Sequence, residues 1–317
     1  MSGLISFNNG LVNLNNKWIF DPLLNLLTRD FSLTGNEDYA NYELSENSNW
    51  FNDITTCEIL NISESTIESL YKALGHEFGT NDLTKVNNLI IDKREKEFRT
   101  FVETHFPVEK VTEILENIKI RNDEQVFSLV TENATVSTIY EYILTIAWYH
   151  LSENKNFHLH KAFQVSLDGN KLPLTHRGGG AGDIEIVTDD YALLVEATLM
   201  DANTQKRGEM EPVIRHSINF ALENKSSQTI FIANDLDNNV LNIFRAAQFI
   251  QFNGTLNTGT INGLKIFALT TNELIIILQK KISDIQLLNT INNHSVAEPM
   301  YVFNNWRQKI INEIIGK

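Results

Sequence analysis

Two acidic residues stand at matching ends of neighbouring apolar segments in the middle of the chain. Asp183 opens the segment DIEIV, and Glu196 lies near the end of the segment ALLVEATL, thirteen positions later. If the two segments are strands joined by one turn, both carboxylates lie at the same end of a hairpin. Such a pair suits Mg²⁺, which is held by one or two carboxylates together with water and substrate phosphate. The spacing therefore predicts a divalent-cation site.

A third carboxylate, Glu141, lies in an apolar segment upstream. It is the single Asp, Glu, Lys or Arg in residues 134–151, ATVSTIYEYILTIAWYHL. The water-covered face of a helix normally carries several charges, so we expect this segment to be a largely buried helix. Burying an unpaired carboxylate is costly, and a nearby cation offsets that cost. We expect Glu141 to face the active site; a place at the edge of the helix is the alternative.

Two further candidates lie downstream, on a helix that is expected to run to about residue 223 with Pro212 in its first turn. Glu209 and His216 are seven positions apart and share one face of such a helix, whereas Glu211 lies on another. We expect Glu209 to join the metal site and His216 to act as a general base or to contact phosphate. The alternatives are an acidic residue favoured by the helix dipole and a structural imidazole.

Basic residues and a glycine run adjoin these carboxylates. The run GGGAG at residues 178–182 precedes a strand, whereas a nucleotide-binding loop stands between a strand and a helix. We therefore expect the glycines to permit close approach of the backbone to DNA or metal, with a tight turn as the alternative. His176 and Arg177 beside the run are candidate contacts to DNA phosphate. Lys206 and Arg207, in an expected loop after the second strand, are two more.

Composition limits the classes of function. With 26 Lys and Arg against 40 Asp and Glu, the net charge is −14 at pH 7, which argues against a broad basic surface for DNA. Divalent cations can still bridge acidic sites to phosphate. The single cysteine, Cys57, excludes an internal disulfide and fits a reducing compartment. With no signal peptide and no apolar run of membrane-spanning length, the sequence predicts a cytoplasmic protein without membrane contact.

Apolar patterning predicts an α/β fold with a mixed central sheet flanked by helices, preceded by a mostly helical N-terminal region. The expected strands are residues 163–167, 183–187, 192–199, 228–233 and 264–269, and the helices among and after them are 212–223, 240–249, 271–281 and 304–315. We expect two domains. Residues 1–122 would serve DNA contact, dimer formation or partner docking, residues 123–317 would be catalytic, and 121–125 would form the hinge.

The N-terminal region contains two helical segments. Residues 54–74 form two short apolar stretches with Ser63 as N-cap of the second, an outline that resembles a helix-turn-helix. Because the second stretch carries Glu64 and Glu68, which the phosphates lining the major groove would repel, a structural helical hairpin is favoured over a DNA-reading one. Residues 84–119 are expected to form two helices split at Pro107, with the mixed-charge run DKREKEFR on a solvated face.

Several of these segments together resemble one nuclease family. HRGGGAGDIEI, LLVEATL and QKRGEMEPVIRH, after ATVSTIYEYILTIAWY, are similar to the AlwI-type restriction and nicking endonucleases, the MlyI and PleI group, most specifically from residue 130 to residue 216. The resemblance implies a PD-(D/E)XK nuclease core and a type IIS-like, site-specific deoxyribonuclease. It also implies five catalytic residues: Glu141, Asp183, Glu196, Glu209 and His216. Three of these, Asp183, Glu196 and Glu209, would hold metal. Gly182 and Thr198 stand where the superfamily motif has proline and lysine.

The leading hypothesis is a Mg²⁺-dependent endonuclease that hydrolyses a phosphodiester bond of double-stranded DNA, alone or as the cleaving subunit of a larger assembly. Each active site of such an enzyme cuts one strand, so cleavage of both strands requires a homodimer or a heterodimer. Lys206 or Arg207 would replace the charge of the absent lysine. The alternative is a non-cleaving DNA-binding or assembly subunit on a nuclease fold, which Thr198 and the negative net charge favour.

Overall fold

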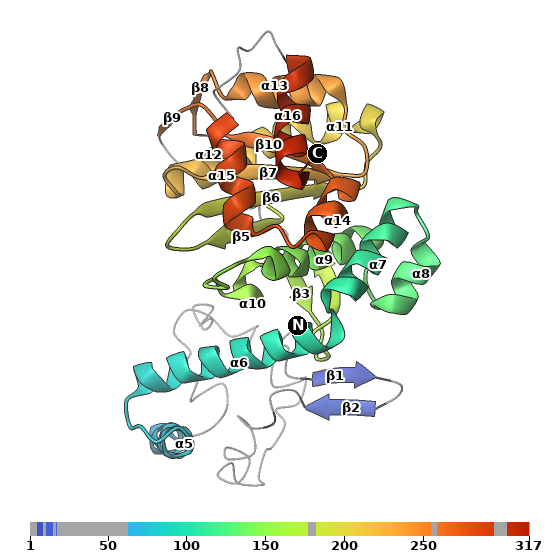
Figure 1. The fold of residues 1–317 in the computed structure, drawn as a ribbon. Helices are drawn as coiled ribbons and strands as arrows, with labels where there is room; N and C mark the ends of the chain where they lie inside the picture. Colours follow the sequence, from blue (N-terminus) through green and yellow to red (C-terminus); the bar gives the residue numbers. More distant parts are fainter. Residues whose placement is uncertain are drawn as a thin grey trace, which may run out of the picture. The chain divides into compact units, whose positions relative to one another are not determined.

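The computed structural model of the protein describes residues 5–8, 11–14, 17, 63–176, 182–254, 259–294 and 303–316. The chain divides into two compact units, residues 1–94 and 95–317, which are drawn in Figure 1. Three features singled out in the sequence lie outside the described residues: the first stretch of the possible helix-turn-helix, Cys57, and residues 177–181, which are Arg177 and the glycine run up to Gly182. The expected domain boundary between residues 122 and 123 stays a prediction.

The first unit combines a small antiparallel sheet with helices. Its elements are β1 (Ile5–Asn8), β2 (Leu11–Leu14), α5 (Glu64–Glu77) and the start of α6 (Leu83–His105), which continues into the second unit. α5 begins where the sequence predicts it, because the Ser63 hydroxyl accepts the backbone N–H of Thr66 at 3.2 Å and satisfies a donor at the helix end.

The second unit is built on a four-stranded sheet with the strand order β10-β7-β6-β5. The strands are β5 (Ile184–Val187), β6 (Ala192–Thr198), β7 (Gln228–Ala233) and β10 (Ile266–Thr270). β5 and β6 are antiparallel, whereas β6, β7 and β10 run parallel, so the sheet is mixed as predicted. The nearly continuous apolar sequence of β7, QTIFIA, suits a central strand that is buried on both faces.

Helices cover both faces of this sheet. Ile230 and Ile232 of β7 belong to one apolar core, and Phe231 between them belongs to the other, as the two-residue period of a strand requires. The first core includes residues of α7 (Val108–Lys119), α9 (Val136–Leu151), α14 (Thr271–Gln279), α15 (Asp284–His294) and α16 (Phe303–Ile315). The second core includes residues of α12 (Met210–Glu223) and α13 (Asn238–Ala247). Each large apolar side chain that is fully buried stabilises the fold by roughly 1.5–3 kcal/mol.

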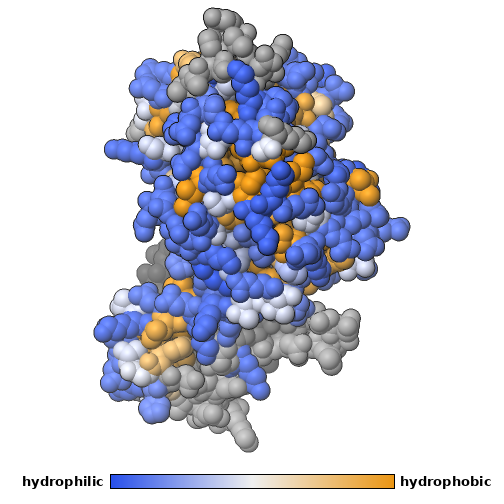
Figure 2. Space-filling view, in the orientation of Figure 1, coloured by the Kyte–Doolittle hydropathy of each residue, from blue (hydrophilic) through white to orange (hydrophobic). Residues whose placement is uncertain are grey.

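The outer surface has the opposite character. On the face drawn in Figure 2, polar side chains cover most of the second unit, with apolar side chains in a band between them. None of the helices among the described residues combines the length and the apolar character that crossing a membrane requires.

Two helices replace segments that the sequence alone assigns to irregular structure. Residues Asp123–Leu129 form α8, so the expected hinge at 121–125 is helical from Asp123 onward. Residues Ala202–Gly208 form α11, where a loop was expected after β6. The Asp201 carboxylate accepts the Thr204 N–H at 2.9 Å, and this capping bond stabilises a helix too short to show an apolar period.

Smaller elements complete the second unit. They are α10 (Leu159–Ala162) and two antiparallel hairpins, formed by β3 (Val165–Leu167) with β4 (Pro173–His176) and by β8 (Gln251–Asn253) with β9 (Thr260–Asn262). β4 brings the end of one hairpin to α9, where it matters for the site described below.

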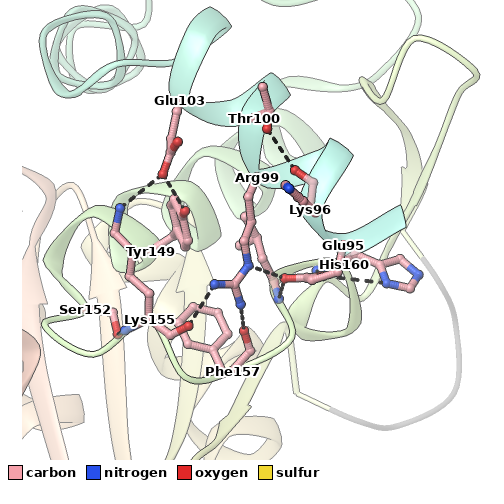
Figure 3. A network of polar contacts seen from close by, with 11 residues as sticks. Glu95, Lys96, Arg99, Thr100, Glu103, Tyr149, Ser152, Lys155, Phe157 and His160 are labelled. Carbon is pink, nitrogen blue, oxygen red and sulfur yellow. Dashed lines mark hydrogen bonds and ion pairs between the residues drawn. The ribbon is translucent and has the colours of Figure 1, made fainter. Parts of the chain in front are cut away.

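A buried polar network holds the end of α6 against the loop that follows α9 (Figure 3). Glu95 is 5% exposed and accepts hydrogen bonds from Arg99 Nε at 2.7 Å and from the Leu159 N–H at 2.7 Å. Arg99 also donates to the carbonyls of Lys155 and Phe157. Because Glu95 is buried, Arg99 is partly buried, and both bond to backbone groups as well as to each other, the network fixes the geometry around the C-terminus of α9.

Candidate active site

The β5–β6 hairpin brings two acidic side chains together as the sequence predicts. Ile184 pairs with Val195, so Asp183 and Glu196 lie at the same end of the two strands. The backbone N–H of Ala197 donates to Asp183 Oδ2 at 2.8 Å, which orients that carboxylate. This geometry is set by the pairing register, because a shift of one residue would turn every side chain to the other face.

Gly182 provides the space that this arrangement needs. A Cβ atom at position 182 would lie 2.1 Å from Leu194 Cδ1 and 2.6 Å from Glu196 Oε1, both closer than van der Waals contact. The absence of a side chain there, rather than a special backbone angle, lets the Glu196 carboxylate occupy its place beside Asp183. Only glycine fits this position without displacing Glu196.

Glu141 reaches the same place from α9. The helix begins after Thr135, whose hydroxyl accepts the Thr138 N–H at 3.2 Å, and is buried along almost its whole length. The side chain of Glu141 is 12% exposed, and its Oε2 atom lies 2.9 Å from His176 Nδ1. Glu141, His176 and Asp183 each offer one potential ligand atom, and these three atoms lie within 4.8 Å of one another. This spacing could hold a metal ion.

α12 forms another wall of the site. Glu209 precedes its first residue, and its backbone carbonyl accepts the Val213 N–H. His216 lies two turns further on. His216 Nδ1 is 3.0 Å from Glu196 Oε1. Glu211 points away, since it pairs with Arg215 at 3.0 Å and its side chain is 72% exposed. The predicted division of these residues between two faces of the helix is confirmed.

One cavity of about 640 Å³ connects these groups. Its lining includes all five predicted catalytic residues and one predicted DNA contact: Glu141, Asp183, Glu196, Glu209, His216 and His176. Four carboxylates and two imidazoles from β4, β5, β6, α9 and α12 therefore face one space. Titratable residues that are far apart in sequence converge there, as expected of a functional site rather than of a solvated acidic surface.

Burial and mutual repulsion disfavour the charged forms of the carboxylates. The pKa of Asp183 rises to about 7, first because it is buried and second because Glu141 is close. The pKa of Glu196 lies well above its ordinary value through burial and the charges of Asp183 and Glu209. Burial also raises the pKa of Glu141, against the effect of its hydrogen bond to His176. A bound cation would favour the ionised forms of all three.

The two histidines are shifted in opposite directions. Burial by itself would lower the pKa of His176, but the hydrogen bond and charge of Glu141 outweigh it and raise the pKa above 6.5. Burial, and then the nearby Arg215, lower the pKa of His216 below 6.5. At neutral pH the first imidazole is the better cation and the second is the better base.

The two basic residues that the sequence predicts as a source of positive charge do not line the cavity. Lys206 and Arg207 are on α11 rather than in a loop, and neither lines the cavity. Lys206 Nζ instead pairs with Asp237 Oδ2 at 3.0 Å. Thr198 does line the cavity, but its hydroxyl accepts the Met200 N–H at 3.1 Å and carries no charge.

His176 lies in a different environment from the one that the sequence predicts. The sequence suggests it as a phosphate contact beside the glycine run, and the structure puts its ring against Glu141, thirty-five residues away. The pairing of β3, which lies within the predicted strand 163–167, with β4 makes this approach possible. β4 has only four residues, too few to show a clear apolar period in the sequence. A histidine at the edge of a glycine-rich segment is the sequence signal that singles it out.

Comparison with known proteins identifies the family of this chain. Among solved structures, the small subunit (R.BspD6I2) of the heterodimeric restriction endonuclease R.BspD6I matches at 16% identity with a TM-score of 0.46, over 63% of this chain and 98% of that chain. No curated protein matches. The model of the AlwI restriction endonuclease family matches residues 17–277, well over half of the sequence. The chain therefore belongs to the AlwI restriction endonuclease family.

Proposed function

We propose that the protein is a Mg²⁺-dependent, site-specific DNA endonuclease, type IIS-like, with a PD-(D/E)XK-like core acting on double-stranded DNA in the cytoplasm. The observation that supports this most is the convergence of Glu141, Asp183, Glu196 and Glu209 on one cavity. Membership of a restriction endonuclease family agrees with hydrolysis of DNA as the reaction. A purely structural or assembly role would not require four carboxylates whose charges repel one another.

The donor set fits a hard divalent cation. Asp183 and Glu196 offer adjacent carboxylates, and the raised pKa values of both show that the protein alone stabilises their charges poorly. Oxygen ligands of this kind are those that Mg²⁺ prefers. When bound, the cation would stabilise negative charge on the scissile phosphate and acidify a water molecule. Glu209 and Glu141 border the same space and would hold a second cation or orient the attacking water.

His216 is proposed as the general base. With Glu196 ionised, the imidazole donates its Nδ1 proton to Glu196 Oε1 over 3.0 Å, which fixes the tautomer and leaves Nε2 to accept a proton. The lowered pKa of His216 keeps the ring neutral at neutral pH, the form that can act as a base. Against the effect of burial, the pKa of His176 is raised by its hydrogen bond to Glu141 and by the charge of that residue, which favours the cationic imidazole that a phosphate contact requires.

Plasmid cleavage tests the proposal. In Mg²⁺ the wild-type protein should convert supercoiled plasmid to the nicked form, and Asp183→Asn should abolish this conversion while the far-UV circular dichroism spectrum stays unchanged. Glu211→Gln is the matched control, because it removes an acidic side chain from the outer face of α12. Nicking by Asp183→Asn at the wild-type rate would refute the site.

The products show how many active sites act together. One cavity is expected to cut one strand, so linear DNA should form only when a second copy or a partner subunit supplies another cavity. Sequencing the ends made from a defined DNA gives the cut position. If the wild-type protein binds DNA but cleaves it under no condition, with or without partners, the alternative of a non-cleaving subunit replaces the proposal.

A further inference from the structure

The cavity carries an excess of negative charge that none of its predicted site residues balances. Besides the four carboxylates of the candidate site, Asp123 also lines it. A DNA phosphate entering this space meets strong repulsion unless fixed positive charge accompanies the metal. Thr198, at the position of the motif lysine, cannot supply it. Among the described residues that line the cavity, Arg121 is the one Lys or Arg side chain.

Arg121 occupies a backbone position where glycine is the usual residue. It follows the end of α7 with φ +59°. Its N–H donates to the Ile118 carbonyl at 3.1 Å, and the N–H of Asn122 donates to the Asn117 carbonyl at 3.0 Å. This pair of bonds is the Schellman ending of a helix, in which the left-handed residue is commonly glycine because a Cβ atom crowds the following carbonyl. The chain thus carries a long cationic side chain at a backbone position where glycine would be more stable.

Hydrogen bonds join the turn to the C-terminal end of β7, in the sheet that carries the candidate site. Asn234, which follows β7, donates to the Ile118 carbonyl at 3.4 Å and accepts from Thr271 Oγ1 at 2.7 Å. Thr271 in turn bonds the Tyr140 hydroxyl at 2.7 Å, one residue before Glu141 on α9. A chain of hydrogen bonds therefore fixes Arg121 relative to the helix that carries Glu141, so its place in the cavity is set by buried structure.

The guanidinium of Arg121 is available for a ligand. It pairs with Asp123 over 3.5 Å between Nε and Oδ1, and its side chain is 55% exposed. By contrast, Lys206 and Arg215 pair with carboxylates at 3.0 Å and line no part of the cavity. The N-terminus of α9, with Thr135 and Ser137, lies on the same wall and adds the partial positive charge of a helix start.

We propose that Arg121 binds the backbone phosphate of the DNA strand that is cut, and so supplies the positive charge that position 198 lacks. This inference rests on the proposed nuclease function. The planar guanidinium can bind two phosphate oxygens at once, which positions the strand as well as neutralising it. Arg121 is then a DNA-binding residue of the active site.

The test separates this role from a structural one by replacing Arg121 with the residue that its backbone prefers. Arg121→Gly should leave the melting temperature unchanged or higher. It should nevertheless weaken binding of a short fluorescent duplex in Ca²⁺ about tenfold, the scale of one charge-assisted contact. The slope of log affinity against log salt should fall by about one, as expected when one phosphate contact is lost. Arg121→Lys should recover part of both effects.

Lys281 offers a matched control within the same chain. It follows α14 with φ +53°, and the bonds from Lys281 N–H to the Leu278 carbonyl and from Ile282 N–H to the Ile277 carbonyl repeat the Schellman ending. Lys281 does not line the cavity. Lys281→Gly removes one positive charge from the same kind of turn and should bind and nick DNA as the wild-type protein does.

The outcomes distinguish failure of this assignment from failure of the proposed function. If Arg121→Gly binds and nicks like the wild type, or if Lys281→Gly loses as much, Arg121 has no specific phosphate contact. If Asp183→Asn loses nicking in that same experiment, the nuclease function still stands. If the wild-type protein neither binds the duplex nor nicks plasmid, both proposals are overturned.

Discussion

Replacing Asp183 by asparagine should make the metal-free protein more stable while it removes activity. Asp183 is half-buried beside Glu141, and both its burial and the neighbouring charge oppose its ionisation. Asparagine has nearly the same shape, and its amide oxygen can still accept the Ala197 N–H that now donates to Asp183 Oδ2 at 2.8 Å. The substitution therefore removes a charge from the cluster and leaves the local hydrogen bond in place.

The magnitude follows from the pKa of Asp183. Folding raises it from 3.8 to about 7, and each pKa unit corresponds to about 1.4 kcal/mol. Because the folded-state pKa is the higher one, the ionised carboxylate destabilises the fold increasingly from about pH 4 to about pH 7 and by a constant amount above that. With partial relaxation of the neighbours, asparagine should stabilise the metal-free protein by about 2–4 kcal/mol at about pH 8 and by almost nothing at about pH 4.

Urea unfolding in the presence of EDTA, repeated across this pH range, measures the effect. Addition of Mg²⁺ should stabilise the wild type, by about 2.7 kcal/mol at a hundredfold excess over its dissociation constant, and should stabilise Asp183→Asn less. Asp201→Asn is the control of opposite sign, since hydrogen bonds from Thr204 lower the pKa of Asp201. Losing that charge should reduce stability above about pH 4 and leave the Mg²⁺ effect unchanged.

Two results would contradict this reasoning. One is an Asp183→Asn protein that is less stable than the wild type at about pH 8 in EDTA. The other is a stabilisation that does not depend on pH, because a change in packing alone has no reason to titrate. Either would mean that the four carboxylates are not electrostatically coupled in the way their burial and spacing indicate.

Two further predictions concern the neighbours of Asp183. Gly182→Ala should destabilise the protein by about 1–3 kcal/mol and lower the nicking rate, because the added Cβ would collide with Leu194 and with the Glu196 carboxylate. Urea unfolding and plasmid nicking measure the two effects. Wild-type values in both assays would show that the Glu196 side chain can move without cost. For His216, the wild-type nicking rate should fall only as the pH drops below 6.5, in keeping with its lowered pKa. His216→Ala should remove this acid limb and slow nicking at all pH values, and a limb that persists in the variant would assign the base to another group.

Much of the site follows from local sequence. Asp183 and Glu196 meet because two alternating apolar segments joined by one turn form a hairpin, and its register is set by which side chains are buried. Glu141 is recognisable as a lone charge in a buried helix, and Glu209 and His216 as two positions on one helix face. The mixed sheet and most of its helices are predictable for the same reason, since their apolar periods run over enough residues to be read.

The remaining features depend on contacts between segments that are distant in the chain. α8 is stabilised by tertiary packing of Val126 and α11 by the Asp201 cap, rather than by an apolar period. The sequence therefore predicts a loop for Lys206 and Arg207, which lie on a helix. Local sequence does not determine which Lys and Arg side chains face the cavity, because the partners of a charged side chain depend on how distant segments are placed. The tertiary structure alone turns His176 toward Glu141 and places Arg121, from a helix end sixty-two residues before Asp183, on the wall of the same cavity.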